Sequence, residues 1–432
     1  MFKKVLMVLV VMTLAGGGRV WAADGMLTIL HTSQLQGRFQ QIMKVGALKE
    51  QIQKETGAVV LFDAGNSFSS QEMIFEHPEG KVSPTVDMMT RAGYDAWVLG
   101  QAETQIDLDF LSQALRNAQF SVLGANLHRP QNGRLLFQVQ PYAVIQAGRF
   151  RVGVLGLGQG GKGVQAGDAV LAAKYYVPLI KQQADVVVLL THLGFPADST
   201  LAEQVADVDL IVGNYSETAE GRSAQVNGVT IRQAGPWGQS AGRIDLRIGQ
   251  DGVTVQRSQL IPLDIPMGSI DAMTVALSAW TLPILGEPMS VTAALGTSAG
   301  GFGASIGQAG AMGYLVSDLM RASVQADIAL VSATSLDSEL PEGAVRVQDV
   351  YRIYAPDHRV VVVEMRGEEL SHLMEEGLDD LRAFFYPSGL QVVYDLTKLR
   401  GQRLVSLMDG ARHPLNLRKK FKVAVESDVV PF

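Results

Sequence analysis

From Met26 to about Ile261, short apolar runs of strand length alternate with longer segments whose apolar residues recur at helical spacing. Such an alternation of buried-looking strands and amphipathic helices is typical of layered α/β domains. We therefore expect an α/β or an α-β-β-α layered domain. Its expected strands include 27–30, 59–62, 96–99, 122–123, 151–155, 186–190 and 210–212, and its expected helices are 43–54, 83–92, 106–117 and 170–183.

The pattern changes after residue 262, where prolines flank one helical piece, Ser269–Trp280. Because proline interrupts regular elements, we interpret residues 263–290 as a connector between two domains, the first spanning 24–262. A second unit follows over 291–432, and its mixed order of helices and strands predicts an α+β domain. Its expected elements are a helix at 314–323, strands at 328–331 and 360–365, and a helix at 368–378.

The first 22 residues have the composition of a secretory signal peptide. Lys3 and Lys4 precede an apolar run that ends near Gly16, and Val20 and Ala22 stand at the −3 and −1 positions of a cleavage site. The run is too short to cross a bilayer as a helix, and no later segment is long and apolar enough to do so. We therefore expect a periplasmic protein with no membrane span in its mature chain.

Composition narrows the chemistry that is open to this chain. It has 432 residues, no cysteine and seven histidines, which excludes disulfides, thiolate metal sites and cysteine nucleophiles. A formal net charge of −7 makes a nucleic-acid partner unexpected. Any metal ion would have to be held by histidine, carboxylate or amide side chains.

Polar residues gather at the carboxyl ends of five expected strands. Because such ends meet along one edge of an α/β sheet, we expect these residues to share one crevice. Amides outnumber imidazoles there, which suits hydrogen bonding to a ligand better than tight binding of a transition metal. The five blocks are 31–37 (HTSQLQG), 63–67 (DAGNS), 100–103 (GQAE), 191–194 (THLG) and 213–217 (GNYSE).

A glycine-rich segment, Gly156–Gly161, fits the pattern G-x-G-x-x-G and follows an expected strand. A dinucleotide site also requires a helix that opens at the third glycine and an acidic residue at the end of the next strand. Residues 162–166 are loop-like, and Asp185 begins the next strand instead of ending it. We therefore favour a surface turn over a phosphate-binding loop.

In the order and spacing of its five blocks, the chain resembles the secreted 5′-nucleotidase family. In that family a calcineurin-like metallophosphoesterase domain precedes a 5′-nucleotidase C-terminal domain, and the resemblance covers nearly all of the mature chain. Further matching segments are 233–238 (QAGPWG), 241–246 (AGRIDL), 340–343 (LPEG), 361–370 (VVVEMRGEEL) and 384–390 (FFYPSGL). The resemblance implies a four-layer metallophosphoesterase-like domain followed by an α+β 5′-nucleotidase C-terminal-like domain.

Active members of the family use two divalent metal ions to activate a water that attacks phosphorus. The resemblance implies which residues of this chain stand at the ligand positions. Gln34 replaces an aspartate, Asn66 replaces the bridging aspartate, and Ala102 replaces the catalytic histidine, while His192 is unchanged. In chain order, the residues at the seven ligand positions are Gln34, Gln36, Asn66, Gln101, His192, Tyr215 and Glu217.

These replacements remove most of the negative charge that two divalent ions require. Amide oxygens are weak ligands for transition metals and leave the charge of the ions uncompensated. We therefore expect no resident cofactor and no catalytic residue. A single weakly held ion at His192 and Glu217 is the alternative.

The substrate side of the family's site has changed as well. Asp337 stands where the resemblance places an arginine that faces the anionic substrate, so the charge there is reversed. Phe384 matches the first base-stacking aromatic residue of the family. We interpret Asp337 and Phe384 as remnants of a substrate pocket.

Together these features predict an exported pseudoenzyme, which binds an unidentified small ligand or an envelope protein. Two alternatives stay open. One is an active 5′-nucleotidase or phosphoesterase with an atypical metal site, and the other is a structural subunit of an envelope complex.

Overall fold

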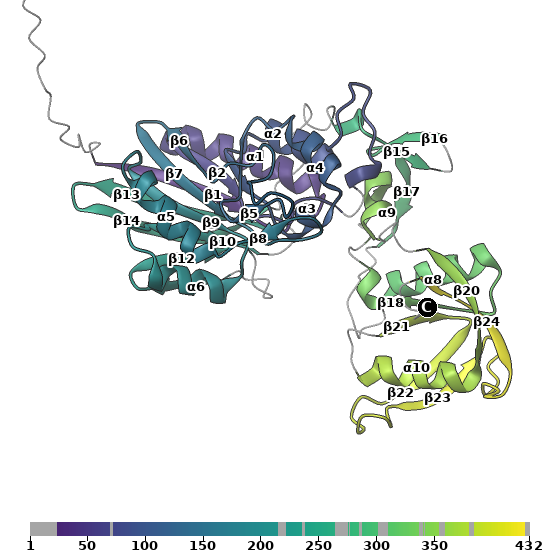
Figure 1. The fold of residues 1–432 in the computed structure, drawn as a ribbon. Helices are drawn as coiled ribbons and strands as arrows, with labels where there is room; N and C mark the ends of the chain where they lie inside the picture. Colours follow the sequence, from purple (N-terminus) through teal and green to yellow (C-terminus); the bar gives the residue numbers. More distant parts are fainter. Residues whose placement is uncertain are drawn as a thin grey trace, which may run out of the picture.

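A computed structural model of the chain contains two lobes, which Figure 1 shows with the N-terminal lobe on the left and the C-terminal lobe at the lower right. The expected signal peptide and most of the expected connector helix, Ser269–Trp280, lie outside the residues that the structure describes. Those residues are 24–69, 72–214, 222–235, 238–263, 275, 277–284, 287–300, 310–336, 340, 342–353, 359–379 and 384–427.

Two six-stranded mixed sheets lie face to face in the N-terminal lobe, and helices cover both outer faces. The predicted α-β-β-α layering is therefore confirmed. The first sheet has the order β14(Gly252–Pro262), β13(Ser240–Gly249), β1(Gly25–Thr32), β2(Val59–Asp63), β3(Ala96–Val98) and β4(Ser121–Leu123). The second has the order β11(Ser223–Val226), β12(Val229–Gln233), β10(Leu210–Gly213), β9(Val186–Thr191), β7(Phe150–Leu157) and β6(Tyr142–Ala147).

Side chains on both faces of the central strands are buried, which explains why their sequences are nearly continuous apolar runs. In β1, Leu27 and Ile29 enter the core between the sheets, while Leu30 packs outward against the helical layer. The outer layers contain α1(Phe39–Thr56), α2(Pro84–Arg91), α3(Gln101–Gln105), α4(Leu108–Leu115), α5(Ala169–Lys181) and α6(Phe195–Gln204). A short pair, β5(Leu127–His128) and β8(Gln165–Ala166), lies outside the two sheets.

Local sequence signals begin the helices where they were expected. Ser83 is the N-cap of α2, and its Oγ accepts a hydrogen bond from Val86 N at 3.0 Å, with Pro84 in the first turn. Asp168 caps α5 in the same way by accepting from Leu171 N at 2.9 Å. Both helices are therefore fixed by capping as well as by their apolar faces.

The glycine-rich segment is not a surface turn, and in this respect the expectation was wrong. Gly156 lies inside β7 and Gly158 just after it, and both are buried. A Cβ on Gly156 would lie 2.2 Å from Leu123 Cβ, and one on Gly158 would lie 2.4 Å from Leu99 O. These glycines allow the two sheets to approach each other closely. The helix that a dinucleotide site requires does not open at Gly161, where the described chain forms an isolated bridge with Val164.

The segment after residue 277 packs on the N-terminal lobe before the chain enters the second one. Trp280 is fully buried, and its Nε1 donates to Asp87 Oδ2 at 3.3 Å. Val291 and Val347 belong to the same core cluster as α1 and α2. Figure 1 accordingly shows this region between the two lobes. Its elements are β15(Thr281–Ile284), β16(Glu287–Ser290), β17(Ala294–Ser298), β19(Gly343–Arg346) and α9(Val347–Ile353).

A four-stranded mixed sheet forms the centre of the C-terminal lobe, with α8(Ala311–Val324) packed on its strands and α10(Gly367–Asp379) contributing to a second core cluster. The order of the sheet is β20(Val360–Arg366), β24(Lys420–Glu426), β18(Ile328–Ser332) and β21(Phe385–Ser388), and β22(Leu390–Tyr394) pairs with β23(Leu404–Asp409). The α+β prediction is confirmed. No helix within the described residues has the length and apolar character needed to cross a membrane.

Candidate functional site

The strand ends of both sheets of the N-terminal lobe meet at one edge, which we call the strand-end site. It contains the described parts of the five polar blocks, namely 31–37, 63–67, 100–103, 191–194 and 213–214. Backbone hydrogen bonds join the first two loops, because Gln34 N donates to Gly65 O at 2.9 Å and Gln36 N donates to Asn66 O at 3.1 Å. The predicted convergence of these blocks is therefore present in the fold.

Glu103 holds the loops of this site together. Its carboxylate is fully buried and accepts four backbone hydrogen bonds. Burial raises its pKa, and the four N–H donors act in the opposite direction by stabilising the charged form. Because the donors come from two different loops, one side chain fixes both. The donors are Asn66 N at 3.1 Å, Ser67 N at 2.7 Å, Phe68 N at 2.9 Å and Gly100 N at 2.7 Å.

Three residues at family ligand positions have left-handed backbone conformations. Gln34 has φ of 57°, Gln36 has φ of 47° and Asn66 has φ of 59°. Asparagine tolerates this region, but each glutamine carries a strain of about 1 kcal/mol or more. The loops therefore keep a costly backbone geometry even though the carboxylate and imidazole ligands of the family are absent.

The amide side chains at these positions hydrogen-bond to the protein itself. Ala102 N donates to Asn66 Oδ1 at 2.8 Å, and because a backbone N–H requires an acceptor, this bond fixes the orientation of the amide. Asn66 Nδ2 then faces Gln34 and donates to its Oε1 at 3.4 Å. The Oε1 of Gln36 accepts from Arg38 Nη1 at 3.3 Å. The amide oxygens of Gln34, Gln36 and Asn66 are therefore already acceptors, and one of the donors is a guanidinium cation.

His192, the residue that matches the family, is buried against these loops. It is 2% exposed, and its Nδ1 lies 2.5 Å from Ala64 O, so Nδ1 carries the proton. Burial lowers the pKa of His192 to about 4, which keeps the ring neutral at pH 7. The ring packs against Gly65 and Gly100, since a Cβ on either would approach it to 2.7 or 2.8 Å.

These donors do not fit a pair of divalent cations. Among the described residues, no three histidine, aspartate or glutamate side chains are grouped so that they could hold a metal ion. The Nδ2 group of Asn66 would present its hydrogens to a cation at the bridging position. Tyr215 and Glu217 lie outside the described residues, and Gln101 is exposed in the first turn of α3.

Asp63, the first residue of the second block, lies on the helix-covered face of the sheet and not between the sheets. Thr32 Oγ1 donates to its Oδ2 at 2.6 Å, and Ser67 Oγ donates to its Oδ1 at 2.7 Å. Burial is the largest influence on this carboxyl group and raises its pKa to about 7. Asp63 therefore anchors the loop after β2 and is not directed at a ligand.

In the C-terminal lobe, Phe384 is packed into a small aromatic cluster. Its ring is 6% exposed, and it meets Tyr386 edge-on at 5.3 Å and Tyr394 at 6.4 Å between ring centroids. Asp337 lies outside the described residues. A substrate role for either residue stays a prediction.

The sequence interpretation placed His31 in the first polar block, but it missed a second buried polar residue beneath the strand-end site, Arg232. Among the residues that the structure describes, neither ring nitrogen of His31 has a hydrogen-bond partner, and Arg232 Nε has none either. The relevant sequence signal is strand periodicity, because Arg232 alternates with Ile231 and must therefore point to the opposite face of β12. Ile231 packs under the helices, so Arg232 enters the space between the sheets.

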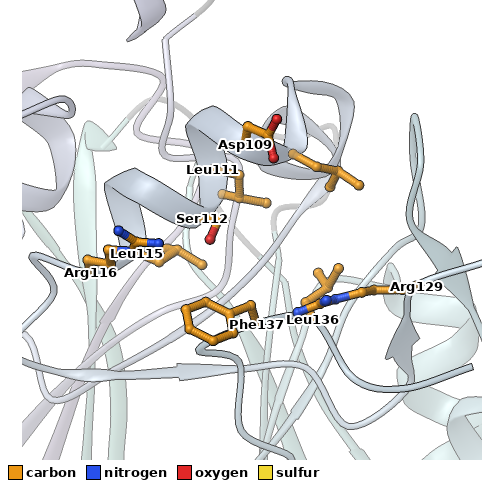
Figure 2. Close-up of a pocket in the computed structure, with 9 residues that line it drawn as sticks. Asp109, Leu111, Ser112, Leu115, Arg116, Arg129, Leu136 and Phe137 are labelled. Atoms are coloured by element: carbon orange, nitrogen blue, oxygen red, sulfur yellow. The ribbon is translucent and has the colours of Figure 1, made fainter. Parts of the chain in front are cut away.

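A separate pocket of about 300 Å³ lies beside α4, away from the polar blocks. Four leucines contribute to its lining, and Figure 2 shows Phe137 between Arg116 on one side and Arg129 on the other. Neither guanidinium forms an ion pair within the part of the chain that the structure describes. The sequence contained no motif for this pocket.

Comparison with known proteins agrees with the architecture. The family model for the 5′-nucleotidase C-terminal domain matches residues 293–428. A 5′-nucleotidase of Vibrio parahaemolyticus is 28% identical over 303 residues, which is 57% of this chain and 52% of the relative. The trifunctional nucleotide phosphoesterase YfkN of Bacillus subtilis is 22% identical over 94% of this chain and 32% of the relative. The chain thus spans about half of the Vibrio relative and a third of the Bacillus one.

Among solved structures, the 5′-nucleotidase precursor of Thermus thermophilus matches with a TM-score of 0.65. The two sequences are 21% identical, and the match covers 94% of this chain and 90% of the Thermus chain. At this identity, the similarity shows that the two proteins share a fold. The described lobes therefore share the fold of solved 5′-nucleotidases, in which a calcineurin-like layered domain precedes a nucleotidase C-terminal domain. Residues 293–428 thus match the 5′-nucleotidase C-terminal domain, and the chain is similar to 5′-nucleotidases and nucleotide phosphoesterases.

Proposed function

We propose that this chain is an exported, periplasmic member of the 5′-nucleotidase family that has lost dinuclear-metal phosphohydrolase activity. In this proposal the strand-end site binds a ligand without hydrolysing it. The site would use hydrogen bonds and cationic side chains where active relatives use metal ions. The proposal covers the chain as given, which spans only part of several relatives.

One observation supports this proposal above the others, namely the hydrogen bond between Asn66 and Gln34. These residues stand at two family ligand positions, and their side chains bind each other with Nδ2 as the donor. A bridging carboxylate offers lone pairs to both metal ions, whereas an amide NH₂ group repels them. Because Ala102 N fixes the amide orientation, rotating Asn66 would break a second hydrogen bond.

The test is metal content together with phosphate release. The purified mature chain would be incubated with Mn²⁺, Zn²⁺, Co²⁺ or Mg²⁺, dialysed and analysed by inductively coupled plasma mass spectrometry. Phosphate release from nucleoside monophosphates would be measured with each metal, and the Vibrio 5′-nucleotidase would be assayed in parallel. We expect less than stoichiometric metal and no release above background. Turnover that disappears in His192→Ala would refute the proposal.

An active hydrolase with an atypical site is the second candidate, and the retained His192 is the observation that favours it. Its neutral ring could ligate one ion through Nε2, since Nδ1 is bound to Ala64 O. Turnover by such an enzyme should fall with His192→Ala and with Glu217→Gln, but not with Glu203→Gln on exposed α6.

The envelope-subunit alternative has a different observation in its favour. A cavity of about 440 Å³ in the C-terminal lobe is lined almost entirely by apolar side chains from α8, α9 and neighbouring strands. Leu319, at its edge, is 61% exposed. Stable co-purification of an envelope protein that is lost in Leu319→Asp but kept in an exposed-face control, Lys398→Asp, would favour this alternative over ligand binding.

A further inference from the structure

We propose that Arg232 and His31 form the floor of an anion site at the strand-end edge, and that the group bound there is a tetrahedral oxyanion such as phosphate or sulfate. The inference deepens the proposed ligand-binding function, on which it rests, by naming the chemical class of the ligand. It assigns recognition of the ligand to a buried arginine in place of metal ions.

The placement of Arg232 follows from strand register. Arg232 pairs with Val212 of β10, and Val212 belongs to the core between the two sheets. Paired residues on parallel strands share a face, so the Arg232 side chain enters the same space. Val212 comes two residues before Asn214 in the fifth polar block. Arg232 therefore lies near the carboxyl end of β12, two residues before the edge of the sheet at which the strand-end site is found.

His31 reaches the same space from the opposite sheet. It pairs with Phe62 of β2, whose side chain is also in the core between the sheets. His31 is fully buried, and its ring packs on Gly242, where a Cβ would collide with Nε2. Burial and then the charge of Arg232 lower the pKa of His31 to about 3. The ring is therefore neutral at pH 7, is close to the guanidinium and has one N–H to donate.

The two groups lack the partners that buried polar groups normally have. Arg232 is 8% exposed, and within the described chain it has no carboxylate partner and no hydrogen bond to its Nε. A buried donor without an acceptor destabilises the folded chain, and it does so more strongly when the group is charged. Because buried polar groups are normally hydrogen-bonded, we infer that a ligand supplies the acceptors that Arg232 lacks in the described chain.

The chemistry of the unpartnered groups selects an anion over a cation. Arginine has only donors, and its planar fork matches two oxygens of a phosphate or sulfate. The buried carboxylates of the neighbouring loops do not compete. Asp63 faces the opposite side of its sheet, and Glu103 is saturated by four backbone donors. Water alone would satisfy the donors but would leave the guanidinium charge uncompensated.

The test is equilibrium dialysis of the full mature chain against ³⁵S-sulfate or ³³P-phosphate, with EDTA present to remove metal ions. We expect saturable binding of one anion per chain. Arg232→Gln should weaken it at least about tenfold, which corresponds to the loss of one charge-assisted hydrogen bond. The matched control is Arg116→Gln, which removes an arginine that has no ion pair within the described residues from the pocket in Figure 2 and should leave binding unchanged.

A second measurement distinguishes the loss of anion binding from misfolding of the variant. Sulfate should raise the thermal midpoint of the natural chain and of Arg116→Gln, but not that of Arg232→Gln. Without anion, Arg232→Gln should be at least as stable as the natural chain, because it removes a buried uncompensated charge. Absence of saturable binding, or equal binding by Arg232→Gln, would overturn the inference. Metal-dependent hydrolysis with intact binding in EDTA would overturn only the proposed function.

Discussion

The shared acceptor at Glu103 leads to a quantitative prediction for Glu103→Ala and Glu103→Gln. Alanine leaves four buried backbone N–H groups without an acceptor. At about 1–3 kcal/mol for each group, and allowing for relaxation and for the removal of a buried charge, we expect a loss of roughly 4 kcal/mol or more. Glutamine keeps one oxygen and should therefore lose about half as much.

Urea unfolding followed by tryptophan fluorescence measures this loss, because Trp97 lies 5.3 Å from Phe68 in the affected loop. Hydrogen exchange in peptides covering 64–69 would locate it. The control is Glu50→Gln on the exposed face of α1, which should change stability by less than about 0.5 kcal/mol. A loss below about 1 kcal/mol in Glu103→Ala, with unchanged exchange in the loop, would refute the role of Glu103 as the anchor.

Three further predictions follow from the same region. Asp63 has a pKa raised by burial to about 7, so its stability contribution is present below the unfolded pKa and is lost as pH rises through 7. Relative to the natural chain, Asp63→Asn should therefore gain stability as pH rises from about 4 to about 8, by up to roughly 4 kcal/mol, and a pH-independent difference in urea midpoints would contradict this. Gly65→Ala should lower the free energy of unfolding in urea by more than about 2 kcal/mol, because Gly65 has φ of 89° and the new Cβ would lie 2.7 Å from His192. The control is Gly57→Ala, where φ is 76° but no atom lies within 4 Å of the new Cβ, so the loss should be only about 1 kcal/mol. Asn66→Asp alone should bind no Mn²⁺ by mass spectrometry, because Gln34 and Gln36 stay neutral; stoichiometric Mn²⁺ would show that one carboxylate suffices.

Much of the fold could be predicted because its signals are local. Alternating apolar runs located the central strands, and Ser83 with Pro84 marked the start of α2. The sequence did not indicate α6 or most strands of the C-terminal lobe, such as β22 and β23. Those strands are short and half-exposed, so their pattern is weak. The division into domains at 262 and 291 stays a prediction.

The sequence predicted which residues form the site, but it did not predict the hydrogen bonds between them. Strand ends indicated that Gln34 and Asn66 would lie close together, yet nothing in the sequence fixed which end of the Asn66 amide would face Gln34. That orientation depends on Ala102 N, a backbone group 36 residues away. Likewise, Arg232 reads as an ordinary strand arginine until the register with Val212 places it between two sheets.

The burial of Val347 in the core beside α1 and α2 has a consequence for how the chain folds during synthesis. This residue lies inside the segment that matches the C-terminal family model, yet it helps to close the N-terminal core. About four-fifths of the 432 residues must be available before that core can be completed. A fragment that ends at residue 290 would therefore expose apolar surface, and the two halves should be expressed as one polypeptide.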